Sequence, residues 1–194
     1  MLALKLGNSI TSSSQALSNV YSLNLDGVDQ SVTADGIGAD MDASVGTYSV
    51  WCKIDDIDAF SIILMGRADS SNQISLYYST FNNAVTASWK AGGTNNYITT
   101  GINIEDDNKW HHIALTWDKT ANQLKLYQDG VLKDTVAMIG TFAGSISLFD
   151  ISSNTDNNHF INAKLAQAAV FTRVVPIGEL FIADQQPVDL TGSA

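Results

Sequence analysis

Several residue types that mark common protein classes are scarce in this chain of 194 residues. Cys52 is the sole cysteine, which excludes an internal disulfide and a thiolate metal cluster. Arginine occurs only as Arg67 and Arg173, and ten basic residues stand against twenty acidic ones, for a net charge of −10. Binding to a nucleic-acid backbone relies on clustered Lys and Arg that release counterions. The basic residues here are scattered, so we expect no nucleic-acid partner.

Long hydrophobic runs are missing as well. No stretch approaches the roughly 20 consecutive apolar residues that a membrane-spanning helix needs, so we expect no membrane association. The first ten residues, MLALKLGNSI, lack the apolar core and the cleavage site of a secretory signal. We therefore expect that the protein is not secreted and that it is assembled in the cytoplasm. Glu and Lys are few while Ser, Thr, Asn and Gly are abundant, and this composition argues against a helical protein.

What is present is a succession of short segments rich in β-branched and aromatic residues and separated by turn signals. Such punctuation is typical of an antiparallel sandwich or barrel. The predicted strands are residues 21–25, 30–34, 47–54, 61–65, 73–79, 84–90, 97–100, 110–117, 123–128, 131–136, 145–149 and 164–171. One short helix is predicted over residues 176–183, with Pro176 in its first turn. Residues 1–19 are rich in Ser and Asn and lack a period, so we interpret them as an N-terminal arm before a single all-β domain over 20–194.

The segment KWHHIALTWDKTANQLKLYQDG, residues 109–130, places two histidines side by side. Successive side chains of a strand point to opposite faces, so His111 and His112 cannot meet at one metal ion or one substrate atom. Both faces of this strand are largely apolar, which predicts an inner strand covered on both sides. Asp129-Gly130 suits a type I′ hairpin turn. We therefore predict that both histidines serve the fold and not a catalytic site.

These segments resemble the laminin-G-like branch of the concanavalin A-like lectin and glucanase superfamily. The resemblance rests on W-H-H-I-A-L-T followed by L-K-L-Y-Q-D-G, on YSLNLDG near the start, on YSVWCK, and on LAQAAVFTRVVPIGEL near the end. It covers about residues 20–183. It implies an all-β, two-sheet jelly-roll sandwich, a fold that serves lectins, glycosidases, pentraxins and passive packing modules alike.

Enzymatic activity is not expected. The resemblance implies that glycosidases of this fold carry a Glu-x-Asp-x-(x)-Glu strand, and retaining hydrolysis needs two carboxyl groups about 5–5.5 Å apart. The two glutamates here, Glu105 and Glu179, are far apart in sequence. The nearest imitation, Asp56 and Asp58, lies at a strand end that is typical of a polar loop. We predict no catalytic residues.

Two kinds of binding residue are candidates. Calcium needs six to eight oxygen ligands, and two polar loops supply Asp69 and Asn72, and Asp150 and Asp156; the alternative is that Asp and Asn favour turns. In the closing strand Ala166 replaces an acid that the resemblance implies for calcium-binding relatives. For glycans, sugar-stacking aromatics lie in one sequence region with Asn82 and Asn83 nearby. The glycan candidates are Tyr77, Trp89 and Tyr97, with Tyr77 expected to be more exposed than Tyr78; the alternative is that these aromatics belong to the core.

Two functions follow. The first is a structural or adhesion protein of an assembly, because the profile resembles stand-alone jelly-roll proteins of tailed-phage virions, used as capsid decorations or as tail and fibre components. In that role residues 1–19 would anchor the domain to other virion proteins or to copies of itself, and the sandwich would touch host-surface glycans. The alternative is a free, lectin-like carbohydrate-binding module.

Overall fold

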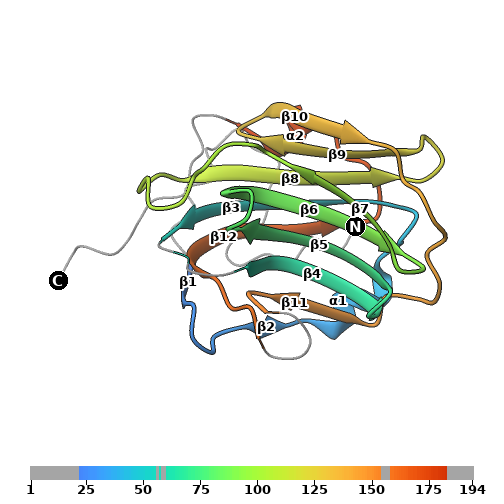
Figure 1. Ribbon diagram of the computed structural model, residues 1–194, viewed down its shortest axis with the longest axis horizontal. Helices are drawn as coiled ribbons and strands as arrows, with labels where there is room; N and C mark the ends of the chain where they lie inside the picture. Colours follow the sequence, from blue (N-terminus) through green and yellow to red (C-terminus); the bar gives the residue numbers. More distant parts are fainter. Residues whose placement is uncertain (1–21, 56, 58–59, 154–157, 183–194) are drawn as a thin grey trace, which may run out of the picture.

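The computed structural model describes residues 22–55, 57, 60–153 and 158–182. Two six-stranded antiparallel sheets stack face to face in this part of the chain (Figure 1). The first sheet contains, in spatial order, β1 (Leu23–Asp26), β12 (Asn162–Phe171), β3 (Val45–Ile54), β8 (His111–Asp118), β9 (Gln123–Gln128) and β10 (Val131–Val136). The second contains β2 (Val32–Thr33), β11 (Leu148–Ile151), β4 (Ser61–Asp69), β5 (Asn72–Ser79), β6 (Ala84–Ala91) and β7 (Thr94–Thr99). The predicted fold class is confirmed.

Two short helices complete the described chain. The helix predicted near the C-terminus is α2 (Ile177–Leu180), shorter than expected. A second helix, α1 (Asp35–Asp40), was not predicted, because Gly36 and Gly38 weaken helix propensity and no side chain caps its start. Among the described residues, neither helix has the length and apolar character that crossing a membrane requires.

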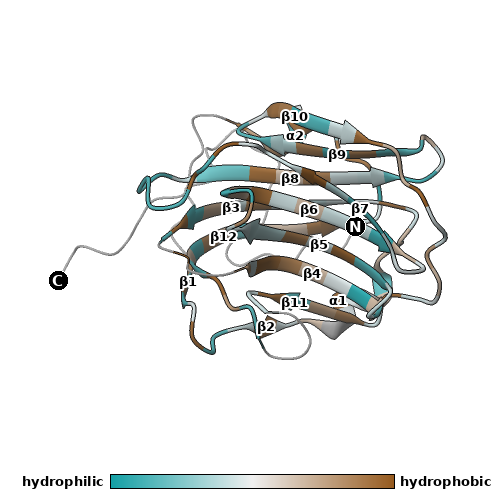
Figure 2. Cartoon of the chain, viewed as in Figure 1, coloured by the Kyte–Doolittle hydropathy of each residue, from teal (hydrophilic) through white to brown (hydrophobic). Residues whose placement is uncertain are grey.

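The core lies between the two sheets and is built on aromatic side chains. Tyr48 on β3 packs edge-on against Trp117, with ring centroids 4.9 Å apart, and against Phe149 at 5.8 Å. All three are essentially inaccessible to solvent. Figure 2 shows the hydrophobic residues concentrated along the strands, while the turns carry most of the hydrophilic ones. Burial of these apolar side chains supplies the main favourable free energy of folding.

The outer face of the first sheet is covered by the segment that follows β12. Thr47 Oγ1 donates to the carbonyl of Arg173 at 2.9 Å and accepts the N–H of Val175 at 3.0 Å. Farther along, Phe181 packs against Trp51, in a small second cluster that also contains Trp110 and Ala166. Strands β3 and β8, in the middle of the first sheet, are therefore buried on both faces.

The histidine pair of β8 behaves as the alternation predicts. His112 lies on the outer face, 1% exposed, with its Nε2 2.9 Å from Ser49 Oγ, and burial lowers its pKa to about 4. His111 lies on the opposite face, toward the edge of the sandwich. Asp129 and Gly130 have φ of 52° and 76°, the positive values that a type I′ turn requires, so that prediction is also confirmed.

Candidate functional site

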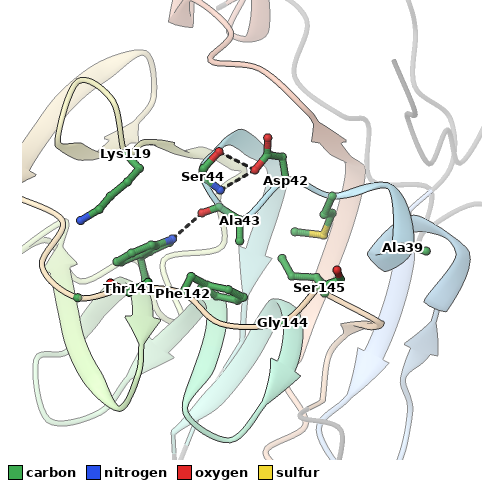
Figure 3. Close-up of a pocket in the computed structure, with 13 residues that line it drawn as sticks. Ala39, Asp42, Ala43, Ser44, Lys119, Thr141, Phe142, Gly144 and Ser145 are labelled. Atoms are coloured by element: carbon green, nitrogen blue, oxygen red, sulfur yellow. Dashed lines mark hydrogen bonds between the residues drawn. The ribbon is translucent and has the colours of Figure 1, made fainter.

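A cleft of about 590 Å³ opens at one end of the sandwich, where β3 begins and β6 and β8 end. Its lining residues come from four distant parts of the sequence. We call it the rim cleft, and its lining residues are Ala39, residues 41–44, Trp89, Lys119, residues 140–142 and residues 144–146. Figure 3 shows Asp42 and Ser44 on one wall, with Thr141, Phe142, Gly144 and Ser145 on the facing wall.

The first wall is a loop held by two buried tryptophans. Trp117 Nε1 donates to the carbonyl of Asp42 at 2.9 Å, and Trp89 Nε1 donates to the carbonyl of Ala43 at 2.8 Å. The Asp42 carboxylate accepts both the N–H and the hydroxyl of Ser44, each at 2.7 Å, through the same oxygen, Oδ1. The loop is thus fixed from beneath, while Asp42 itself is exposed.

The second wall is held by three asparagines. Asn96 accepts the N–H of Ile139 at 2.8 Å and donates to its carbonyl at 2.7 Å. Asn122 accepts the N–H of Met138 at 3.0 Å, and Asn72 accepts the N–H of Ala143 at 2.9 Å. These bonds replace the missing strand pairing of the 138–143 segment, so a loop without regular structure has a defined shape.

Some amides of this second wall are left unpaired in the described part of the chain. Within the described part of the chain, the N–H groups of Gly140, Thr141, Gly144 and Ser145 have no hydrogen-bond partner. Gly140 and Gly144 have φ of 102° and 77°, values that residues with a Cβ rarely adopt. These glycines let the backbone turn repeatedly along the cleft.

Lys119 closes one end of the rim cleft. Its backbone N–H donates to the carbonyl of Ser44 at 2.7 Å. Its Nζ donates to the carbonyl of Met138 and lies 5.3 Å from the centroid of the Trp89 ring, within the range of a cation–π contact. Lys119 is therefore tied to the first wall through its backbone N–H and to the second through its ammonium.

This arrangement can bind a polyhydroxyl ligand and lacks the parts for hydrolysing one. Asp42 offers acceptors on one wall and the free amides offer donors on the other, while the Phe142 ring supplies an apolar surface. Asp42 is the one acid among the lining residues. Hydrolysis of a glycosidic bond by either usual route needs two carboxyl groups across the bond.

Of the predicted calcium ligands, Asp69 and Asn72 lie together and Asp150 lies apart from them. Asn72 is 4% exposed, its oxygen already accepts the N–H groups of Gly92 and Ala143, and its amide nitrogen faces Asp69. Asp150 accepts the Thr33 hydroxyl at 2.8 Å and pairs with Met65, about 13 Å along β4 from Asp69 at the usual rise per residue. Asp156 lies outside the described residues, as do Asp56 and Asp58. Among the described residues, no group of three or more His, Cys, Asp or Glu could hold a metal ion.

The predicted glycan-binding aromatics divide between two faces of the second sheet. Trp89 is 1% exposed and points into the core, which corrects the expectation that its ring is a surface platform. Tyr97 pairs with Ser88, the neighbour of Trp89, and so lies on the outer face, 63% exposed. Tyr77 lies on that same face against Phe60, at 4.5 Å between ring centroids, and burial raises its pKa to about 12. Tyr78 points inward and is fully buried, so Tyr77 is the more exposed of the two, as predicted.

A second cluster lies at the opposite end of β8. His111 stands between two carboxylates, with Nδ1 2.7 Å from Asp129 Oδ2 and Nε2 2.9 Å from Asp107 Oδ2. Hydrogen bonds to Asp129 and Asp107 raise the pKa of His111 against the opposing effect of burial. A hollow of about 360 Å³ borders this cluster and is lined in part by Trp110 and Phe181. We call His111, Asp107 and Asp129 the His111 cluster.

Of the residues that line the rim cleft, Trp89 alone was predicted from the sequence as a binding residue. Asp42 and Ser44 form an Asp-x-Ser motif, and Gly140 and Gly144 punctuate a polar stretch, but both patterns are ordinary turn signals. Lys119 gives no local signal at all. The four segments become one site only when the strands have assembled.

Solved structures share the fold of this chain at low sequence identity. The receptor-binding domain of botulinum neurotoxin type G matches with a TM-score of 0.63 and 15% identity, over 82% of this chain and 40% of that one. The carbohydrate-binding module CBM40 of the Ruminococcus gnavus IT-sialidase, solved with α2,3-sialyllactose, matches with a TM-score of 0.64 and 14% identity, over 84% of this chain and 97% of that one. Domain 4 of the arabinanase AbnA from Geobacillus stearothermophilus, solved with arabinotriose, matches with a TM-score of 0.58 and 17% identity, over 82% of this chain and 69% of that one.

No curated protein matches the chain. A family match, however, covers residues 26–179, most of the sandwich, including the WHH strand, the Asp-Gly hairpin and both walls of the rim cleft. The chain belongs to the concanavalin A-like lectin/glucanases superfamily.

Proposed function

We propose that this protein is a non-enzymatic carbohydrate-binding domain and that the rim cleft receives the sugar. One observation carries the proposal: exposed acceptors at Asp42 and Ser44 lie across a single cleft from the wall that contains the unpaired amides of Gly140, Thr141, Gly144 and Ser145. Neighbouring sugar hydroxyls both donate and accept hydrogen bonds, so they need both kinds of partner on opposite sides.

The rigidity of the two walls supports this proposal. A site holds its ligand well when its contacting groups are locked by their own neighbours before the ligand arrives. Trp89 and Trp117 lock the Asp42 loop, and the asparagines lock the facing loop. The solved structures with sialyllactose and arabinotriose add a second line of support, because domains of this fold do receive sugars.

Binding to a glycan array, followed by calorimetry on each hit, tests the proposal. Asp42→Asn keeps the oxygen that accepts from Ser44 but removes the charge, so the loop should hold its shape. We expect about tenfold weaker sugar binding, because a hydrogen bond to a charged group is worth roughly 1.5–3 kcal/mol. Asp134→Asn, on the exposed edge strand β10, is the matched control and should bind normally. Absence of binding to every glycan would refute the proposal.

The sequence supports a finer role, as an adhesion component on the surface of a phage virion that is assembled in the host cytoplasm. Residues 1–19, the proposed anchor, lie outside the described residues, and none of the comparisons bears on this role. The solution mass of the full chain, beside a version without residues 1–19, tests it. A defined oligomer formed by the full chain alone supports the assembly role, and two monomers of equal stability favour the free lectin-like module.

A further inference from the structure

The two ends of the rim cleft differ in charge. Lys119 is the one cation among the lining residues, and Figure 3 shows it at one end, away from Asp42. Its Nζ donates one hydrogen bond, to Met138, and an ammonium has three donors. Two N–H groups therefore remain for a ligand, on a side chain already held by the Trp89 ring.

The unpaired amides extend this donor region along the second wall. Thr141 and Gly140 follow directly after the Met138–Ile139 segment to which Lys119 is tied, and their N–H groups have no partner in the described chain. An ammonium beside free backbone amides is suited to a carboxylate, whose two oxygens accept hydrogen bonds and donate none. The Asp42 end is suited to hydroxyl groups and repels a carboxylate.

From this polarity we infer that the rim cleft selects sugars that carry a carboxylate, such as sialic or uronic acids, and that Lys119 is the residue that determines this specificity. The inference rests on the proposed function. The carboxylate lies against Lys119 and the 140–141 amides, and the hydroxyls of the same ligand lie against Asp42 and Ser44.

The charge of the whole chain makes the role of Lys119 decisive. A net charge of −10 repels an acidic sugar at long range, so attraction must come from contacts inside the cleft. Ion pairing at a partly open site weakens as salt is added, since the Debye length falls from about 10 Å at 0.1 M to about 3 Å at 1 M. Binding of the acidic sugar should therefore be salt-dependent, and binding of a neutral sugar should not.

Calorimetry with 3′-sialyllactose and lactose, a pair that differs by the acidic sugar, tests the inference on the full-length protein. We expect sialyllactose to bind at least tenfold more tightly than lactose, a factor that corresponds to 1.4 kcal/mol. Lys119→Met should remove that preference, and Lys119→Arg should restore part of it because the charge is retained. Lys125→Met, on the outer face of the first sheet, is the matched control. A melting curve for each variant tests whether the protein still folds without the hydrogen bond from Lys119 to the Met138 carbonyl. Uronic acid oligosaccharides and their carboxyl-reduced forms provide a second pair.

The outcomes separate the two proposals. Equal binding of acidic and neutral partners in both pairs, with the cleft residues perturbed in NMR spectra, would refute the inference and leave the carbohydrate-binding function standing. A carboxylate preference that survives in a folded Lys119→Met variant would refute the role of Lys119. Failure of every glycan to bind would overturn the proposed function and the inference with it.

Discussion

Replacing His111 with glutamine should destabilise the protein in a way that depends on pH. Both imidazole nitrogens lie within hydrogen-bond distance of a carboxylate, and carboxylates only accept, so the charged ring, with a proton on each nitrogen, is the form that satisfies both partners. A hydrogen bond to a charged group is worth about 1.5–3 kcal/mol when buried. Asp107 and Asp129 are 28% and 37% exposed, so solvent screening reduces each bond to about 1 kcal/mol or less. We expect His111→Gln to lower the free energy of unfolding by about 1.5 kcal/mol near pH 5.5.

The sign of the pH dependence follows from the shifted groups. Hydrogen bonds to Asp129 and Asp107 raise the pKa of His111 in the folded state, so its contribution is complete below the unfolded value of about 6.5 and is lost as the pH rises through the folded pKa. Burial alone would raise the pKa of Asp129, but the bonds from His111 and the His112 amide outweigh burial and lower it. The contribution of Asp129 to stability is present above its unfolded pKa of about 3.9 and is lost as the pH falls through its lower pKa in the folded state. The stability difference between wild type and variant should therefore peak at mildly acidic pH.

Urea unfolding of both proteins across the pH range measures this difference. His112, with its pKa lowered to about 4, destabilises both proteins in acid, so its effect largely cancels. His159→Gln, which removes an exposed histidine that contacts Phe60, is the control and should give a small difference without a maximum. A His111→Gln difference that is constant with pH, or that grows above about pH 8, would show that the ring is held by packing and not by its charge.

Four further expectations concern packing, loop shape, reactivity and metal. Gly46→Ala places a Cβ in steric overlap with the Trp117 ring, so unfolding in urea should show a loss of about 3 kcal/mol, and a loss below about 1 kcal/mol would contradict this contact. Asn96→Ala leaves both polar groups of Ile139 unpaired and should cost about 3 kcal/mol and weaken sugar binding, whereas Asn95→Ala, at an exposed position, should cost under about 1 kcal/mol. Cys52 is fully buried, and burial, with Asp129 and Asp107 nearby, raises its pKa, so a thiol reagent should label it only after unfolding; fast labelling of the native protein would be contrary evidence. Calcium should leave the melting temperature unchanged relative to EDTA, and a clear rise would favour the predicted ligands Asp69, Asn72, Asp150 and Asp156.

Most of the fold was predictable because the local sequence pattern of each segment is enough to indicate a strand. Tyr78 shares a face with Ile74 and Leu76, and the period of two places all three in the core. The Asp129-Gly130 pair specifies its turn by itself, since few other residue pairs accept two positive φ values. Helix α1 escaped prediction for the opposite reason. Its sequence, DGIGAD, disfavours a helix, and it is held by its position beside β11, where the Ala34 amide donates to the Phe149 carbonyl.

The rim cleft could not be predicted, because its shape depends on contacts between distant residues. The pattern around Asn72 indicates a polar turn, and a polar turn suits a cation ligand as well as a structural residue. What decides between them is Ala143, 71 positions away, whose N–H occupies the asparagine oxygen. Trp89 is similar: its sequence neighbourhood suggests a sugar platform, but its indole N–H is committed to the Ala43 carbonyl, 46 positions earlier. Both candidates hold the loops of the site, and the groups proposed to meet a ligand are Asp42 and the unpaired amides of Gly140, Thr141, Gly144 and Ser145.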